Sequence, residues 1–355
     1  MAATLDIPGF NYRPFLYDTA HRVLPQGFLL GSETCSTVSS RGVYKFPVVR
    51  KSMAKYPDHQ SSGYDVEHCG WSNLPEDDFI RQEDHDWSMG EFIWTGIDYL
   101  GEPTPYYSDW PSHSSLFGAV DLAGLPKDRF YLYRSHWKKD AETLHVLPHW
   151  TWPGREGEVT PIFVYTNYPE AELFINGKSQ GRQRKDRSIK IEDTENEDSQ
   201  KAFTRQKRYR LMWMDTKYEP GEVKVVAYND AGEVAEEKVI RTAGKPHHLE
   251  LVADRTTLTA DGRDIAFVTV RVVDKEGNLI PDDARLLTFR VTGAATFRAA
   301  ASGNPASLDA FHLPRHHAFS GQLVTLVQSS EQSGEAVLHV SAKGLPTATL
   351  RLQIK

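Results

Sequence analysis

The sequence predicts an α/β unit followed by two all-β units. In roughly the first 140 residues, short apolar runs alternate with helix signals, an alternation typical of α/β folds. From about residue 142 onward, apolar residues recur at every second position and turn sequences recur about every ten residues, as in immunoglobulin-type sandwiches. A Gly-Lys-Pro segment at 244–246 divides this second part. We therefore predict an α/β domain over 1–141 and immunoglobulin-like β-sandwiches over 142–243 and 246–355.

Two strands and two helices can be located within the α/β part. The strands are brief apolar runs bounded by glycine, at 27–31 and 91–95, as buried parallel strands often are. Pro75 is followed by three acidic residues, which suits a helix N-terminus because the unpaired N–H groups there favour negative charge. A second helix is expected to open at 126–128 (Pro-Lys-Asp), where aromatic residues follow at helical spacing.

The β-rich part is marked by specific turn sequences. Asn176-Gly177 interrupts an apolar alternation and predicts a hairpin with a type I′ turn, since both residues tolerate positive φ angles. Val268, Val270 and Val272 are expected to share one face of a strand in the last unit. These local signals place strands and turns without relying on any relative.

The bulk composition argues against several classes of protein. The chain carries 41 Lys+Arg against 48 Asp+Glu, a net charge of −7 without a dense basic stripe, so we expect no nucleic acid partner. No apolar run approaches the roughly 20 residues that span a bilayer, so no membrane partner is expected. Cys35 and Cys69 are expected to be buried thiols. Adjacent His316 and His317 would point to opposite faces of a strand as surface residues, and we expect neither a metal site nor a cofactor.

Glu33 and Trp94 are the candidate functional residues. Each comes at the end of a predicted strand of the α/β part, and in barrels of alternating strands and helices such ends form the active site. A carboxylate can attack or stabilise an anomeric carbon, while an indole face stacks on the apolar side of a pyranose. Two plain alternatives stay open at this point: a capping or salt-bridged glutamate, and a tryptophan of the core.

Several motifs resemble bacterial β-galactosidases of glycoside hydrolase family 2. The most specific is the run at 92–106, Phe-Ile-Trp-Thr-Gly-Ile-Asp-Tyr-Leu-Gly-Glu-Pro-Thr-Pro-Tyr, which follows Gly-Ser-Glu-Thr at 31–34. Further similar pieces are Gly-Phe-Asn-Tyr at 9–12, Phe-Gly-Ala-Val-Asp-Leu-Ala-Gly at 117–124 and Leu-Pro-His-Trp at 147–150. The resemblance covers nearly the whole chain and identifies it as a C-terminal portion of such an enzyme.

The resemblance implies a role for each candidate residue. Residues 1–141 would be the C-terminal part of a catalytic (β/α)8 barrel, about strands six to eight, acting on a galactoside-containing oligosaccharide. Glu33 would be the nucleophile of a retaining glycosidase and Tyr12 would orient it. Trp94 would form the floor of the sugar-binding site, and Asn11 and Asp98 would contact sugar hydroxyls. The small residues at 34–36 depart from the best-known branch, where an aromatic and a histidine follow the nucleophile, so the exact sugar is left open.

The general acid/base that retaining hydrolysis requires is not found in the expected place. In this family the general acid/base is the Glu of an Asn-Glu pair that follows strand four. The Asn-Glu pair of this sequence is Asn196-Glu197, and it lies in a highly charged stretch at 184–207. We expect that stretch to be a solvated loop. We therefore expect the isolated chain to be inactive. Its partner would be the missing N-terminal part of the enzyme or a second copy of the chain. No signal peptide is recognised, and export is expected if the full-length enzyme carries one.

An alternative of a different class also remains. The chain could be a non-catalytic carbohydrate-binding or adhesion protein whose β-sandwiches bind the sugar. Binding that survives Glu33→Gln and maps to 246–355 would favour this second hypothesis.

Overall fold

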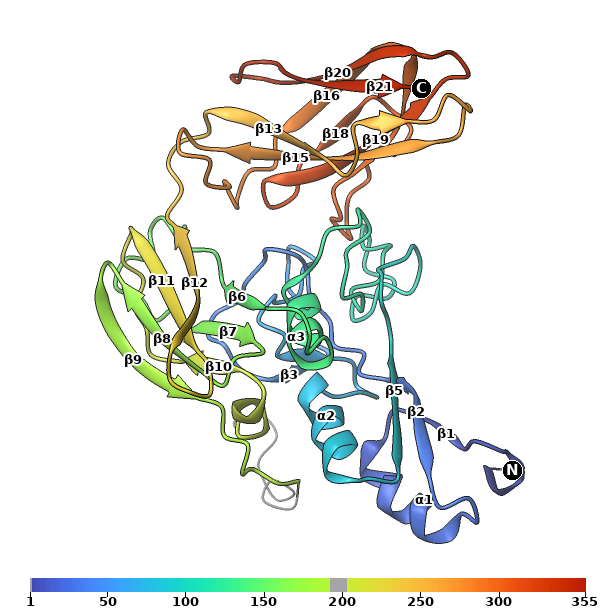
Figure 1. Ribbon diagram of the computed structural model, residues 1–355, viewed down its shortest axis with the longest axis vertical. Coiled ribbons are helices and arrows are strands. Elements are labelled where there is room, and N and C mark those ends of the chain that lie inside the picture. The colour runs from blue at the N-terminus through green and yellow to red at the C-terminus, as the bar shows by residue number, and fades with distance from the viewer. Residues whose placement is uncertain (1, 192–202) are drawn as a thin grey trace.

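The computed structural model describes residues 2–191 and 203–355, and most of its regular structure is strand. Figure 1 shows an N-terminal part that carries the three α-helices, a middle part of strands β6 to β12 beside it, and a C-terminal part of strands β13 to β21 at the opposite end of the long axis. Among the described residues, none of the helices is long and apolar enough to cross a membrane. The domain boundaries predicted from the sequence stay a prediction.

A three-stranded parallel sheet organises the N-terminal part. Its strands are β1 (Gly9–Asn11), β2 (Leu29–Thr34) and β5 (Ser88–Ile93), in the order β1-β2-β5. The chain crosses from β1 to β2 through α1 (Tyr17–Val23), and α2 (Pro75–Asp84) precedes β5. Because all three strands run the same way, their carboxyl ends meet at one edge of the sheet.

The observed strands are shifted from the predicted ones by two or three residues. The sequence suggested Gly31 as a strand end, but β2 continues past it to Thr34. The glycine is needed there for close packing, since a Cβ at this position would lie 2.9 Å from the hydroxyl oxygen of Tyr17. Glu33 is therefore the penultimate residue of β2. The second strand begins at Ser88 and ends at Ile93, so Trp94 follows it directly.

The helices begin where the sequence predicts. α2 begins at Pro75, and the Asp77 carboxylate accepts a hydrogen bond from the Leu74 N–H at 3.0 Å, satisfying a donor that the helix leaves free. α3 (Asp128–Trp137) follows Lys127. The remaining short elements are η1 (Ala2–Thr4), η2 (Pro14–Leu16), η4 (Arg205–Arg208), β3 (Lys51–Ser52) and β4 (Glu67–His68).

The middle part consists of two sheets, β10-β7-β6 and β12-β11-β8-β9, with an apolar core between them. Its strands are β6 (Leu144–Leu147), β7 (Ile162–Thr166), β8 (Glu170–Ile175), β9 (Lys178–Arg184), β10 (Leu211–Trp213), β11 (Glu222–Tyr228) and β12 (Val234–Arg241). The predicted hairpin is confirmed: Asn176 and Gly177 join β8 to β9 with φ angles of 49° and 77°.

All five residues of β7 are buried, which shows that the strand packs on both of its faces. Ile162 and Val164 belong to the core of the middle part, whereas Phe163 and Tyr165 belong to a core shared with the N-terminal part. This strand therefore joins the two parts through continuous apolar packing.

The C-terminal part also has two sheets, β13-β15-β19-β17 and β14-β21-β20-β16-β18, around one core. Its strands are β13 (His248–Ala253), β14 (Thr257–Leu258), β15 (Ile265–Val273), β16 (Leu286–Gly293), β17 (Ala295–Ala301), β18 (Arg315–His317), β19 (Gln322–Ser329), β20 (Gly334–Ala342) and β21 (Ala348–Ile354). Val268, Val270 and Val272 lie on one face of β15 and are fully buried, as predicted. His316 is also buried, at 1% exposure, so the expectation of a surface residue was wrong there; the Phe311 and His316 rings stack against each other.

Hydrogen bonds attach the C-terminal part to loops at the carboxyl edge of the parallel sheet. The Arg41 guanidinium donates to Asp121 at 2.6 Å, and to the carbonyl oxygens of Ser302 and Phe319 at 2.8 and 3.1 Å. Arg41 follows β2 and Asp121 follows β5, so the C-terminal part lies beyond the end of the sheet where Glu33 is found (Figure 1).

The charged stretch 184–207 is not simply a solvated loop. Ile189 and Ile191 are buried at 8% and 2% exposure, and Arg205 is paired with Asp77 of α2 at 2.7 Å. The expectation of a solvated segment was therefore wrong for these residues, because alternating isoleucines bring it onto the N-terminal part. Asn196-Glu197 lies outside the described residues.

Candidate functional site

Glu33 lies at the carboxyl edge of the parallel sheet, on its middle strand. Its side chain is half-buried, and its backbone is in register with Asn11 on β1. The Glu33 carbonyl accepts a hydrogen bond from the Tyr12 N–H at 2.6 Å. Glu33 has no ion-pair partner among the residues that the structure describes. The backbone of Glu33 is thus held by β1, and its carboxylate is not paired with a cation of the described residues.

Tyr12 places its hydroxyl beside this carboxylate. The chain turns at Tyr12 with a φ angle of 56°, immediately after β1. Its hydroxyl lies 2.7 Å from the Ser36 Oγ. Burial, together with the hydrogen bond and the charge of Glu33, raises the pKa of Tyr12 well above its ordinary value, while hydrogen bonds from Ser36 and Trp71 oppose the rise. Tyr12 therefore keeps its proton and remains a hydrogen-bond donor close to Glu33.

Trp94 occupies the next position along the same edge. Its N–H donates to the Thr34 carbonyl at 2.8 Å, which ties the end of β5 to the residue after Glu33, and its peptide bond to Thr95 is cis. The indole N–H donates to the Tyr99 hydroxyl at 3.1 Å, and Tyr99 in turn donates to Glu102. These bonds set the orientation of the half-buried ring, which directly follows β5, the strand next to the one that carries Glu33.

Asn11 and Asp98 differ in their exposure and in their hydrogen-bond partners. Asn11 is exposed on β1, and its Oδ1 accepts a hydrogen bond from the Ser32 Oγ at 2.9 Å, which leaves its amide N–H groups available. Asp98 is 5% exposed, and its oxygens are bound by Lys127 at 2.6 Å and the Gly118 N–H at 2.8 Å. Burial raises the pKa of Asp98 and Lys127 opposes this. The geometry gives no support to Asp98 as a sugar-binding residue.

Comparison with known proteins decides the family. Residues 249–351 match the glycoside hydrolase family 2 C-terminal domain 5, and residues 157–235 match a domain of unknown function, DUF4982. The chain is 38% identical to the β-galactosidase BoGH2A of Bacteroides ovatus, over 99% of this chain and 39% of that protein. The chain belongs to glycoside hydrolase family 2. This confirms the identification made from the motifs at 31–34 and 92–106.

Other family 2 proteins show the same relationship. The crystal structure of a β-glycosidase from Bacteroides vulgatus superposes with a TM-score of 0.83 at 27% identity, over 98% of this chain and 45% of that one. A putative β-glucuronidase of Formosa agariphila is 31% identical over 62% of this chain and 20% of its own length. The chain thus spans less than half the length of these relatives. Their names include both β-galactosidases and β-glucuronidases, which establishes a glycosidase family without deciding the sugar.

Several residues of this family 2 site were missed by sequence reasoning. Ser36 hydrogen-bonds the Tyr12 hydroxyl, the 42% exposed Trp71 helps to lower the pKa of Tyr12, and Tyr99 with Glu102 orients the Trp94 indole. Trp71 and Ser36 stand in segments without periodicity, so nothing local marks them. A lone tryptophan between Gly70 and Ser72 was the available signal.

Glu91 is not a second carboxylate of the site. It faces the helices, because its Cβ lies near Gly31 and Tyr17, and its Oε2 accepts a hydrogen bond from the Thr34 Oγ1 at 2.8 Å. Burial raises the pKa of Glu91 to about 7, and burial together with the charge of Glu91 raises that of Asp78 on α2 well above its usual range. These two acids lie behind the sheet, away from the edge that carries Glu33.

Proposed function

We propose that this chain carries the nucleophile of a retaining glycoside hydrolase of the β-galactosidase type, which hydrolyses terminal β-D-galactosides in oligosaccharides. The observation that carries the proposal is the position of Glu33 at the carboxyl edge of a parallel sheet, with Tyr12 hydrogen-bonded to its backbone and Trp94 at the end of the adjacent strand. The 38% identity to a β-galactosidase favours galactosides over glucuronides. We assign β1, β2 and β5 to strands six to eight of a (β/α)8 barrel on the same grounds.

The reaction would be a double displacement. Glu33 attacks the anomeric carbon and forms a glycosyl-enzyme, which water then hydrolyses. Tyr12 donates a hydrogen bond to the carboxylate and Trp94 stacks on the apolar face of the sugar. A general acid must protonate the departing oxygen, and we propose that a carboxyl group outside residues 1–355 supplies it. Such a partner would cover the two open edges of the sheet, on β1 and β5.

A labelling experiment tests the nucleophile separately from the acid. In a 2-deoxy-2-fluoro-β-D-galactosyl fluoride the leaving group is a weak base, so departure needs little protonation. Incubated with the chain, this reagent should form a covalent adduct that peptide mass spectrometry places on Glu33. Tyr12→Phe should slow the labelling, because the carboxylate loses the donor that orients it.

Two variants complete the test. Glu33→Gln should abolish the adduct, while Asp109→Asn, which removes a half-exposed carboxylate paired with Lys55 in the loop after β5, should retain it. An unlabelled chain, or an adduct on another carboxylate, contradicts the assignment. Turnover of an aryl β-galactoside by the isolated chain, abolished by Glu33→Gln, would contradict the proposal that the general acid lies elsewhere.

One observation favours the alternative of a carbohydrate-binding protein. A cleft of about 730 Å³ lies between the loop after β5 and the C-terminal part, with Trp110, 70% exposed, on one wall and Leu308 and Phe311 on the other. An exposed indole with polar neighbours such as Arg298 can stack on a pyranose. Oligosaccharide binding that is lost in Trp110→Ala and unchanged in Glu33→Gln would favour this function over catalysis.

A further inference from the structure

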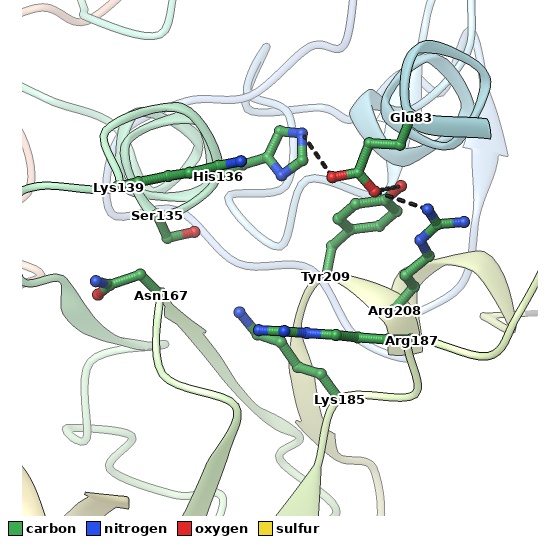
Figure 2. Close-up of a pocket in the computed structure, with 9 residues that line it drawn as sticks. All are labelled: Glu83, Ser135, His136, Lys139, Asn167, Lys185, Arg187, Arg208 and Tyr209. Atoms are coloured by element: carbon green, nitrogen blue, oxygen red, sulfur yellow. Dashed lines mark hydrogen bonds and ion pairs between the residues drawn. The ribbon is translucent and has the colours of Figure 1, made fainter. Parts of the chain in front are cut away.

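A cavity remote from Glu33 lies where the N-terminal and middle parts meet. It has a volume of about 430 Å³ and is bordered by the C-terminal ends of α2 and α3, by the segment after β9, and by the residues around η4 (Figure 2). Figure 2 shows side chains from these elements converging on one space. None of the residues assigned to the glycosidase site lines it.

The cavity is strongly cationic. Four basic side chains line it, from three separate elements: Lys139, Lys185, Arg187 and Arg208. Glu83 is the carboxylate on its wall. A small space with four positive charges and one negative charge is electrostatically unfavourable unless a further anion enters it.

The Glu83 carboxylate is already hydrogen-bonded to other side chains. Its carboxylate accepts hydrogen bonds from the Arg208 Nη2 at 2.8 Å and the Tyr209 hydroxyl at 2.9 Å, and the His136 Nε2 lies 3.9 Å away (Figure 2). Arg208 is paired additionally with Asp84 at 2.9 Å. The one acidic group therefore neutralises Arg208, and the charge of the other three basic residues stays uncompensated.

Those three residues also repel one another. Within the part of the chain that the structure describes, Lys139, Lys185 and Arg187 have no carboxylate at ion-pair distance, and the Lys185 ammonium donates to the Thr166 carbonyl. Burial and the nearby charge of Arg187 lower the pKa of Lys185 to about 7. Burial and the charges of Lys185 and Lys139 lower the pKa of His136 to about 4, although Glu83 opposes this.

We propose that this cavity binds a tetrahedral oxyanion, a sulfate or phosphate group that is either free or carried on a sugar. Arg187 offers a planar fork of donors and Lys185 a compact charge, a combination that suits tetrahedral oxyanions. The cavity is larger than one such group needs, which leaves room for a sugar attached to it. The site is independent of Glu33, so the proposal does not rest on glycosidase activity.

Calorimetric titration with inorganic sulfate and inorganic phosphate, at constant ionic strength, tests this directly. One saturable site is expected, and Arg187→Gln should weaken it about tenfold or more through loss of one charged contact. Arg187 is exposed and has no ion-pair partner among residues 2–191 and 203–355, so the variant should fold normally. Arg241→Gln is the matched control: it removes the same charge from an exposed pair between Arg241 on β12 and Glu222 on β11, and should leave the affinity unchanged.

The dependence of sulfate binding on pH gives a second readout, because sulfate keeps its charge. If the protonated form of Lys185 binds, the affinity should be about tenfold higher at pH 6 than at pH 8. The other groups facing Lys185 are Glu83, His136, Lys139, Arg187 and Arg208. His136 stays neutral between these pH values because its pKa is about 4. Lys185→Met should remove the pH dependence.

Two results would overturn the proposal: no saturable binding of either anion, or equal binding by the native chain and Arg187→Gln. The source of the group follows from a third titration. Tighter binding of galactose 6-phosphate than of inorganic phosphate at pH 8, where both carry about two negative charges, would show that the group is carried on a sugar, and equal binding would show a site for the free ion.

Discussion

The ion pair between Arg210 and Glu76 should be essential for joining the middle part to the N-terminal part. Both side chains are 0% exposed. The Arg210 guanidinium also donates to the Tyr64 carbonyl at 3.1 Å and the Tyr165 hydroxyl at 3.3 Å. Burial alone would lower the pKa of Arg210, but the charges of Glu76 and Tyr165 raise it above its ordinary value. Arg210 is therefore charged and entirely dependent on partners inside the protein.

Replacing Arg210 with Met leaves the Glu76 carboxylate buried without a counter-ion. Breaking a buried pair in this way costs about 3–5 kcal/mol, because the remaining charge has lost both water and its partner. Glu76→Leu should cost a similar amount for the same reason. The double variant Glu76→Leu with Arg210→Met removes both charges of the pair and should recover several kcal/mol relative to the sum of the single variants.

Urea unfolding followed by tryptophan fluorescence, with calorimetry to resolve separate transitions, measures these changes. Arg351→Met is the control, since its pair with Glu335 has side chains that are 74% and 53% exposed, and the change should stay within about 0.5 kcal/mol. A loss below about 1 kcal/mol in Arg210→Met, or strictly additive single variants, would refute the reasoning.

Three further predictions concern stability. The pKa of Glu91 is about 7 in the folded protein against an ordinary 4.5, so the folded state keeps a proton that the unfolded chain loses. The free energy of unfolding should therefore fall by up to about 3 kcal/mol as the pH rises from 4.5 to 8. Urea unfolding at several pH values measures this slope, and Glu91→Gln should flatten it. Gly118→Ala should destabilise the fold by about 2 kcal/mol or more in thermal unfolding, since a Cβ would collide with the backbone of Asp98, whereas Gly96→Ala, in open space, should be nearly neutral. Trp150→Ala should cost about 3–5 kcal/mol, because this side chain is 1% exposed and donates to the Glu219 carbonyl at 2.9 Å; an unchanged unfolding midpoint would contradict it.

Elements with a local chemical signature could be predicted from the sequence. The start of α2 at Pro75, the Asn176-Gly177 turn and the buried face of β15 all depend on residues within a few positions of one another. Glu33 was also found at the end of its strand. The predicted end of β2 was too early because Gly31 looks like a strand end in the sequence. The reason for a glycine at this position is close packing against Tyr17, which belongs to another element and is not visible in the local sequence.

The sequence by itself determined the alternation of strands and helices, the β-rich second half, and the motifs that identify family 2. Only the tertiary structure decided which side chains meet. It turned Asp98 toward Lys127, brought Ser36 and Trp71 to the Tyr12 hydroxyl, and gathered basic residues from three elements around one cavity. The physical reason is that backbone propensity acts over a few residues, whereas ion pairs and buried hydrogen bonds form between segments that packing of the apolar cores brings together.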